Sequence, residues 1–425
     1  METQASQRFS IPFQYALMLA INIGFLVFAF ALDTPANILT GFITIITSQV
    51  VLITDFIAVG GIGAALTNVA VVGILSILML LRSNAKPSGA TIMALWVTAG
   101  FAFFGKNVYN MIPLTAGVWL FSRYKKEPYS NYSLASLLVA TLSPVVSQMS
   151  FLGVLSPPLE ILMGVAIGIG IGFIFPAVSA HMVRMHSGYD LYSMGFAGGL
   201  IALILSTTVN SMGLRVLPVS VYSTGNNLIL GILMYAVSLV LILVGLFSGN
   251  GLKDNLIKYK KFFSHSGRLI TDFYFLFKNT IYLNMGILCA FATTLTLLIG
   301  AELNGISIAG IFTTVGFACF GKHILNVPPI LIGATLSAYL NTWDFTTPAN
   351  VAAILFAAAL APLAGQFGWI WGIVAGFLHV SVAMHVGELC GGMNLYNNGF
   401  AAGFIAMLLL PIITLSERMR KNHED

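Results

Sequence analysis

The sequence predicts an all-α polytopic membrane protein made of two inverted repeats, each with five transmembrane helices and one re-entrant hairpin that contains a broken helix. Three observations lead to this fold class. The 425-residue chain is 58% hydrophobic and only 8% charged, whereas about a quarter of the residues in a soluble domain are charged. Ten apolar runs reach the length of about 20 residues that a membrane-spanning helix needs. Two segments of the chain also occur a second time, in the same order.

The ten apolar runs are the predicted transmembrane helices. They comprise residues 11–31, 57–81, 132–154, 158–183, 189–208, 226–247, 281–300, 348–366, 368–387 and 395–415. Two further regions, 90–122 and 307–340, are each interrupted in the middle by a Gly-Lys pair, and we interpret each as a hairpin that returns to the side from which it started. Residues 33–56 contain several polar side chains, and we expect this insert to be interfacial or re-entrant.

Basic residues predict the orientation of the spans. If both termini are cytoplasmic, the lysines and arginines of the loops fall on the cytoplasmic side, and only Arg215 falls outside. This asymmetry is the positive-inside bias of multi-pass proteins. This bias explains the net charge of +5 without a nucleic-acid partner. We expect the lipid bilayer to be the partner of the chain. The sequence is compatible with a homo-oligomer and with a monomer.

The internal repeat is clearest at the two hairpins. Residues 100–120 read GFAFFGKNVYNMIPLTAGVWL and residues 316–336 read GFACFGKHILNVPPILIGATL, with ten of 21 positions identical. A second match follows downstream, between residues 188–199 (GYDLYSMGFAGG) and 392–403 (GMNLYNNGFAAG). Because these matches keep their order, we infer a duplication that covers most of the chain.

The duplication divides the chain into residues 1–225, with the insert at 33–56, and residues 226–425, with a basic cytoplasmic linker at 250–279. Each repeat contains five spans, and five is an odd number. The second repeat is therefore expected to cross the membrane upside down relative to the first. Inverted repeats with broken helices are the plan of many transporters.

The paired hairpin motif and the span that begins LYxxGFAxG resemble the domain-of-unknown-function 1576 family of bacterial membrane proteins over nearly the whole chain. The resemblance implies a multi-pass protein of the bacterial cytoplasmic (plasma) membrane, and it supplies no activity or site residues. The plan of five spans plus a re-entrant element per inverted repeat is also similar to that of urea transporters. No urea-transporter motif matches the chain, so that similarity concerns architecture alone.

The predicted binding site lies at the two hairpin tips. A helical arm of about 15 residues is about 22 Å long, which is shorter than the hydrocarbon core of about 30 Å, so each tip is expected inside the bilayer. There the glycine can break the helix, and the lysine adds a positive charge beside the start of a second helix. The predicted substrate-binding residues are Gly105, Lys106, Asn107, Asn110, Gly321, Lys322, His323 and Asn326.

Two alternatives stay open at the tips. Each arm could cross the membrane fully, with its lysine extending to the far headgroups. Asn110 and Asn326 could bind a solute, or they could tie the backbone at the break.

A second group of polar residues brackets corresponding turns of the two repeats. These candidates for proton or ion coupling are His181, Asp190, His385 and Asn394. Histidine and buried carboxylates are the groups that proton-coupled carriers use. The alternative is that they lie in water at loop ends, and Arg184 and His186 favour a loop at the first turn.

Composition and motifs together predict the functional class. No catalytic constellation is recognisable, and Cys289, Cys319 and Cys390 form no CxxC pair, so we expect neither an enzyme nor a cofactor or metal site. The leading interpretation is a secondary carrier or facilitator for a small polar, preferably anionic, solute. The alternatives are a channel for a neutral polar solute such as urea, and an intramembrane enzyme or assembly factor.

Overall fold

The computed structural model describes residues 11–214, 220–249, 251–269 and 271–424, and Arg215 lies outside the described residues. Ten helical segments in these ranges are long and apolar enough to cross a membrane, and each overlaps one predicted span. They confirm the all-α polytopic class. The segments are Phe13–Leu32 (α1), Ile62–Arg82 (α4), Tyr129–Ser150 (η1, α7, η2 and α8), Pro157–Met185 (α9), Ser193–Ser211 (α10), Asn227–Phe247 (α11), Phe273–Leu298 (α13, η3 and α14), Pro348–Phe367 (α17, η4 and α18), Trp369–Leu389 (α19) and Asn397–Met419 in α20, which continues to Glu424.

Two pairs of shorter helices lie where the sequence predicts hairpins. The first pair is α5 (Gly89–Phe101) and α6 (Val108–Lys125), and the second is α15 (Gly305–Phe317) and α16 (Val327–Leu340). In each pair the chain breaks at the glycine of the Gly-Lys motif, whose φ is +87° in the first hairpin and +113° in the second. These left-handed angles favour glycine over residues with a Cβ atom.

The arms α5 and α15 pack side by side in opposite directions. A Cβ atom on Gly89, at the start of α5, would lie 2.7 Å from the carbonyl oxygen of Cys319, beyond the end of α15. Reciprocally, a Cβ atom on Gly305 would lie 2.6 Å from the carbonyl oxygen of Phe103. The arms therefore overlap along about 20 Å, the length of their 13 residues. The two Gly-Lys tips lie at opposite ends of this pair, and the expectation that the tips meet at the centre is wrong.

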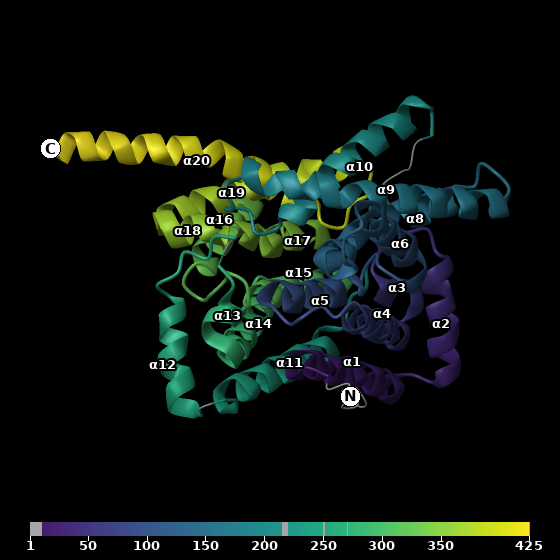
Figure 1. Ribbon diagram of the computed structural model, residues 1–425, viewed down its shortest axis with the longest axis horizontal. Coiled ribbons are helices and arrows are strands. Elements are labelled where there is room, and N and C mark those ends of the chain that lie inside the picture. Colours follow the sequence, from purple (N-terminus) through teal and green to yellow (C-terminus); the bar gives the residue numbers. More distant parts are fainter. Residues whose placement is uncertain (1–10, 215–219, 250, 270, 425) are drawn as a thin grey trace, which may run out of the picture.

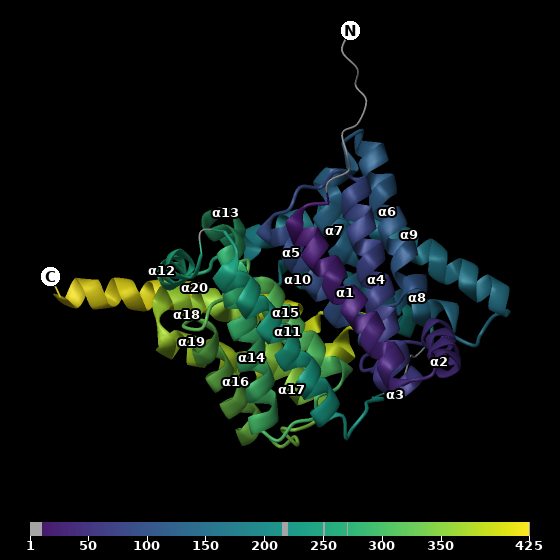
Figure 2. The same ribbon diagram turned by 90° about the horizontal axis from the view of Figure 1, so that it is seen from below.

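The segment between the first two spans of each half forms an insert. In the first half it contains α2 (Pro35–Thr47) and α3 (Phe56–Gly60), and in the second it contains α12 (Leu252–Phe262). Figure 1 shows α12 and the C-terminal end of α20 on the left and α2 on the right. Figure 2, seen from below, again places α12 and α2 far apart. The two inserts thus lie at opposite ends of the molecule.

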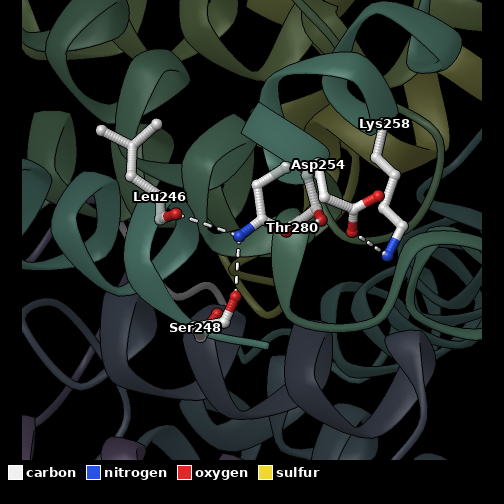
Figure 3. A network of polar contacts seen from close by, with 6 residues as sticks. Leu246, Ser248, Asp254, Lys258 and Thr280 are labelled. Carbon is white, nitrogen blue, oxygen red and sulfur yellow. Dashed lines mark hydrogen bonds and ion pairs between the residues drawn. The ribbon is translucent and has the colours of Figure 1, made fainter. Parts of the chain in front are cut away.

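One buried amide anchors the basic linker to the helices beside it (Figure 3). The side chain of Asn255 in α12 donates to the carbonyl oxygens of Leu246 (3.0 Å) and Ser248 (2.7 Å) at the end of α11, and accepts from the Thr280 hydroxyl (2.8 Å). An ion pair between Lys258 and Asp254 adds a surface contact one turn apart. Such exposed pairs contribute little stability, so the amide is the more important anchor.

Reciprocal backbone hydrogen bonds join the two halves. The third and eighth spans are each interrupted by a 3-10 turn, η2 (Val139–Leu142) and η4 (Ala357–Leu360). The N–H of Leu191 donates to a carbonyl in η4 (3.0 Å), and the N–H of Leu395 donates to a carbonyl in η2 (2.8 Å). Each bond runs from one half to the other. A two-fold relation between the halves would produce such a pair of contacts, and its orientation in the membrane stays a prediction.

Candidate functional site

Two equivalent asparagines hold the broken backbone of the hairpins. The Asn68 amide in α4 donates to the carbonyl oxygens of Ala102 (2.7 Å) and Lys106 (2.9 Å). In the second half the Asn284 amide donates to those of Ala318 and Lys322, both at 2.7 Å. All these groups are buried, where an unpaired carbonyl is costly. The preceding span therefore stabilises each break by replacing the hydrogen bonds that a continuous helix would make.

The predicted residues Asn110 and Asn326 also tie the backbone at the breaks. The Asn110 amide group donates to the carbonyl oxygen of Gly105 (2.9 Å), and the Asn326 amide group donates to that of Gly321 (2.9 Å). Each side-chain oxygen accepts from the backbone N–H three residues earlier, at 2.9 Å in both hairpins. Of the two alternatives for these residues, the structure favours the backbone tie.

The inserts cover the hairpin tips. The Asn107 amide donates to the carbonyl oxygen of Ile45 at the end of α2 (3.0 Å), and His323 Nε2 donates to the carbonyl oxygen of His265 in the basic linker (2.9 Å). A Cβ atom on Gly267 would lie 1.9 Å from the carbonyl oxygen of Gly321, so the linker touches the second tip closely. The tips are therefore buried against protein.

The Lys106 side chain folds back along its own arm toward the middle of the protein. It is 1% exposed, and its ammonium group donates to the Thr98 hydroxyl (3.1 Å) and to the carbonyl oxygen of Leu137 (3.1 Å). Both acceptors are neutral. Among the residues that the structure describes, no acidic side chain lies within 4.0 Å of this cation.

The Lys322 side chain has different partners. Its ammonium group donates to the hydroxyl of Tyr192 and lies over the rings of Tyr192 (4.5 Å) and Phe317 (5.3 Å). The buried carboxylate of Asp190 lies within electrostatic range of this cation, although more than 4.0 Å from it. One Asp190 oxygen accepts from the Tyr192 N–H (2.7 Å), whereas Oδ2 has no hydrogen-bond partner in the described part of the chain. The second lysine thus has a nearby acid, and the first does not.

Two equivalent tyrosines, one from each half, lie against each other beside the Lys322 site. The rings of Tyr192 and Tyr396 lie 4.6 Å apart, and both are buried. Asn394 occupies the position that corresponds to Asp190, where its oxygen accepts from the Thr141 hydroxyl (2.6 Å) and the Tyr396 N–H (3.0 Å). Sequence reasoning did not single out the tyrosines, although both belong to the repeated LYxxGFAxG motif.

The four proposed coupling residues do not form one cluster. Asp190 and Asn394 are buried, whereas His181 and His385 are exposed, the latter beside Trp343 (5.5 Å between ring centroids). The assignment of His186 to a solvated loop is wrong. This side chain is fully buried, and its Nδ1 accepts from the Asp190 N–H (3.2 Å). In the described residues, no three His, Cys, Asp or Glu side chains lie together as a metal site would require.

A second repeated motif connects each insert to the hairpin of the opposite half. The pentapeptide LITDF occurs at 52–56 and at 269–273. The Asp272 carboxylate accepts from the Gly89 N–H (3.0 Å) at the start of α5, and the Asp55 carboxylate lies against Gly305 at the start of α15. Both carboxyls lie outside the long spans. Burial raises the pKa of each, while hydrogen bonds from N–H groups oppose this shift.

Comparison with known proteins gives one match. A family model described as "Protein of unknown function (DUF1576)" matches residues 34–211 and 252–415. No curated protein and no solved structure matches the chain.

Proposed function

The chain belongs to the DUF1576 family, and we propose that it moves a small polar, preferably anionic, solute across the bacterial cytoplasmic membrane as a secondary carrier or facilitator. In this proposal the chain catalyses no reaction, both termini are cytoplasmic, and the two halves are inverted repeats with re-entrant hairpins. The antiparallel arms and the inserts at opposite ends of the molecule support this arrangement.

The observation that carries the proposal is the environment of Lys106. Its ammonium group is buried among membrane-spanning helices and has only neutral hydrogen-bond acceptors. A cation removed from water needs a compensating anion or a strong hydrogen-bonding shell. Ionisable residues at such depth mark solute or proton pathways in membrane proteins. A solute anion that reaches Lys106 would supply the missing negative charge.

The environment of Lys322 supports coupling to protons. There the ammonium group donates to the Tyr192 hydroxyl, and the Asp190 carboxylate lies beyond 4.0 Å but within electrostatic range. One oxygen of this carboxylate has no hydrogen-bond partner in the described residues. A group with a free lone pair next to a cation is suited to gain or lose a proton as its surroundings change. Of the four proposed coupling residues, Asp190 is therefore the one that we retain at the centre.

The test is solute flux into liposomes that contain the purified protein, with acetate and inorganic phosphate as anionic probes and urea as a neutral probe. Lys106→Met deletes the charge and keeps the apolar stem, and we expect it to reduce anion flux by orders of magnitude while the protein still elutes as a folded species. Lys106→Arg is the matched control that keeps the charge. Normal anion flux through Lys106→Met contradicts the proposal, and urea flux without anion flux identifies a neutral-solute channel.

A further inference from the structure

A small, mainly apolar cavity with two asparagines in its lining lies between the tip of the first hairpin and the second half of the chain. Its volume is about 80 Å³, and its floor contains the buried side chains of Phe104, Phe356 and Asn397. Its rim contains partly exposed residues, among them Leu52 and Met384. Since one water takes up about 30 Å³ in the liquid, this cavity has room for a solute of roughly the size of two or three waters.

The Asn397 amide is the polar group without a partner on the cavity floor. It is 3% exposed, and neither its oxygen nor its nitrogen has a hydrogen-bond partner among the described residues. Buried amides are nearly always hydrogen-bonded, because an unpaired donor or acceptor loses its hydration without compensation. The neighbouring Asn398 is satisfied by the imidazole of His379 (3.1 Å). The cavity therefore presents one free acceptor and one free donor group to whatever occupies it.

The equivalent polar group in the first half has a hydrogen-bond partner. Ser193 stands where the second half has Asn397, and its hydroxyl is hydrogen-bonded to His186 Nε2 (3.0 Å). Beside it, the Arg268 side chain donates to the carbonyl oxygen of Ser187 (2.6 Å) and lies over the ring of Tyr189 (4.9 Å). The two halves thus differ in a way that a carrier open toward one side would show.

We propose that this cavity is the solute's access site on the side of α2, and that Asn397 binds a small carboxylate that also carries a hydroxyl group. The carboxylate would accept from the Asn397 amide group, and the hydroxyl would donate to its oxygen. This inference rests on the proposed anion transport and specifies the solute class. The cavity reaches the first hairpin, because its lining residue Leu395 contacts Gly105, the residue before Lys106.

The experiment measures access and protection and does not depend on transport. In a chain whose three native cysteines are replaced by alanine, Ala353→Cys places a thiol in the cavity, and Ala135→Cys places one at the corresponding position of the first half. An anionic, membrane-impermeant methanethiosulfonate reagent is added to intact cells. We expect Ala353→Cys to react at least tenfold faster than Ala135→Cys. Equal rates overturn the access site.

The solute class is tested with glycolate and acetate, which differ by the hydroxyl group. Glycolate is expected to slow the labelling of Ala353→Cys several-fold more than acetate does, and Asn397→Leu should remove this difference. Equal protection by the two probes, no protection, or protection that persists in Asn397→Leu overturns the role of Asn397. Asn397→Leu should also leave the melting temperature unchanged or raised, and a lower value means that the amide is satisfied within the protein. Normal anion flux through Lys106→Met, together with the expected protection here, overturns the proposed role of Lys106 in transport and leaves solute binding in the cavity in place.

Discussion

The two Gly-Lys hairpins share their backbone geometry and differ in how their charges are compensated. Both are broken at a left-handed glycine, and in both an asparagine of the preceding span binds the two carbonyl oxygens that flank the break. The ammonium group of Lys106 has a hydroxyl and a carbonyl as partners, whereas that of Lys322 has a tyrosine and a nearby aspartate.

This difference distinguishes the contacts that stabilise the hairpin backbone from the contacts that set the chemistry of its lysine. A broken helix in a low-dielectric interior must satisfy its carbonyl groups in the same way wherever it occurs, so both halves keep the same asparagine contacts. The break does not require the same partners for the lysine ammonium group in both halves. Asp190 corresponds to Asn394, so the second half has an acidic side chain within electrostatic range of its lysine, whereas the first half has a neutral amide at the equivalent position.

The largest expected effect concerns the orientation of the two inserts, and it is all or none. Gln49→Cys, in the exposed segment after α2, should react with an impermeant thiol reagent from outside intact cells. Lys260→Cys, exposed on α12, should react only after the membrane is permeabilised. Reaction of both from the same side contradicts the inverted relation between the halves.

The next effect sharpens the comparison of the lysines. Lys322→Met leaves the Asp190 carboxylate buried without the nearby cation. Removal of one partner of a contacting buried pair costs about 3–5 kcal/mol, and because these two groups lie more than 4.0 Å apart we expect a loss at the lower end of this range. Lys106→Met removes a cation that has no acidic partner, so the free energy of unfolding in detergent should stay the same or increase. The double variant Lys322→Met/Asp190→Asn should recover most of the loss. Equal destabilisation by the two Met variants refutes the assignment of Asp190 to Lys322.

A smaller and equal effect is expected at the two asparagines of the preceding spans. Asn68→Leu and Asn284→Leu each leave two buried carbonyl groups without a donor, and each should lower the free energy of unfolding by about 1–3 kcal/mol. Thermal unfolding of the two variants in the same detergent measures this. A large difference between them means that the two breaks are not supported alike.

The smallest effect is expected at the two LITDF carboxylates. Asp272→Ala removes the acceptor for the first N–H of α5, and loss of such a cap costs about 1 kcal/mol. Both carboxylates have further donors, which are the Ser223 N–H (2.9 Å) and hydroxyl (2.6 Å) for Asp55 and the N–H groups of Tyr274 and Phe275 for Asp272. Asp55→Ala should cost more, because Asp55 is fully buried and Asp272 is only partly buried. Paired unfolding measurements check the order. A larger loss in Asp272→Ala contradicts it.

The LITDF repeat could have been identified from the sequence alone. Its copies begin 217 positions apart, at 52 and 269, and the hairpin motifs begin 216 positions apart, at 100 and 316. This agreement in spacing distinguishes it from chance repeats such as TPAN, at 34–37 and 347–350, which are 313 positions apart. A short match carries little weight in an apolar chain unless its spacing is compared with that of longer matches.

The sequence by itself determined the ten spans, the two pairs of shorter helices and the position of the break in each pair. These features depend on local properties, namely the length of an apolar run and the backbone freedom of a glycine. Repetition added the correspondence between the halves, including Gly105 with Gly321 and Asp190 with Asn394. The motifs likewise indicated the family to which the chain belongs.

Only the tertiary structure decided where the lysine charges lie. The arms overlap along their full length, so the tips end far from each other, and the Lys106 side chain folds back toward the middle of the protein. The burial of His186, the exposure of His181 and the unpaired amide of Asn397 were equally beyond the sequence. These properties depend on contacts between helices hundreds of residues apart, and neither spacing nor composition encodes which groups meet there.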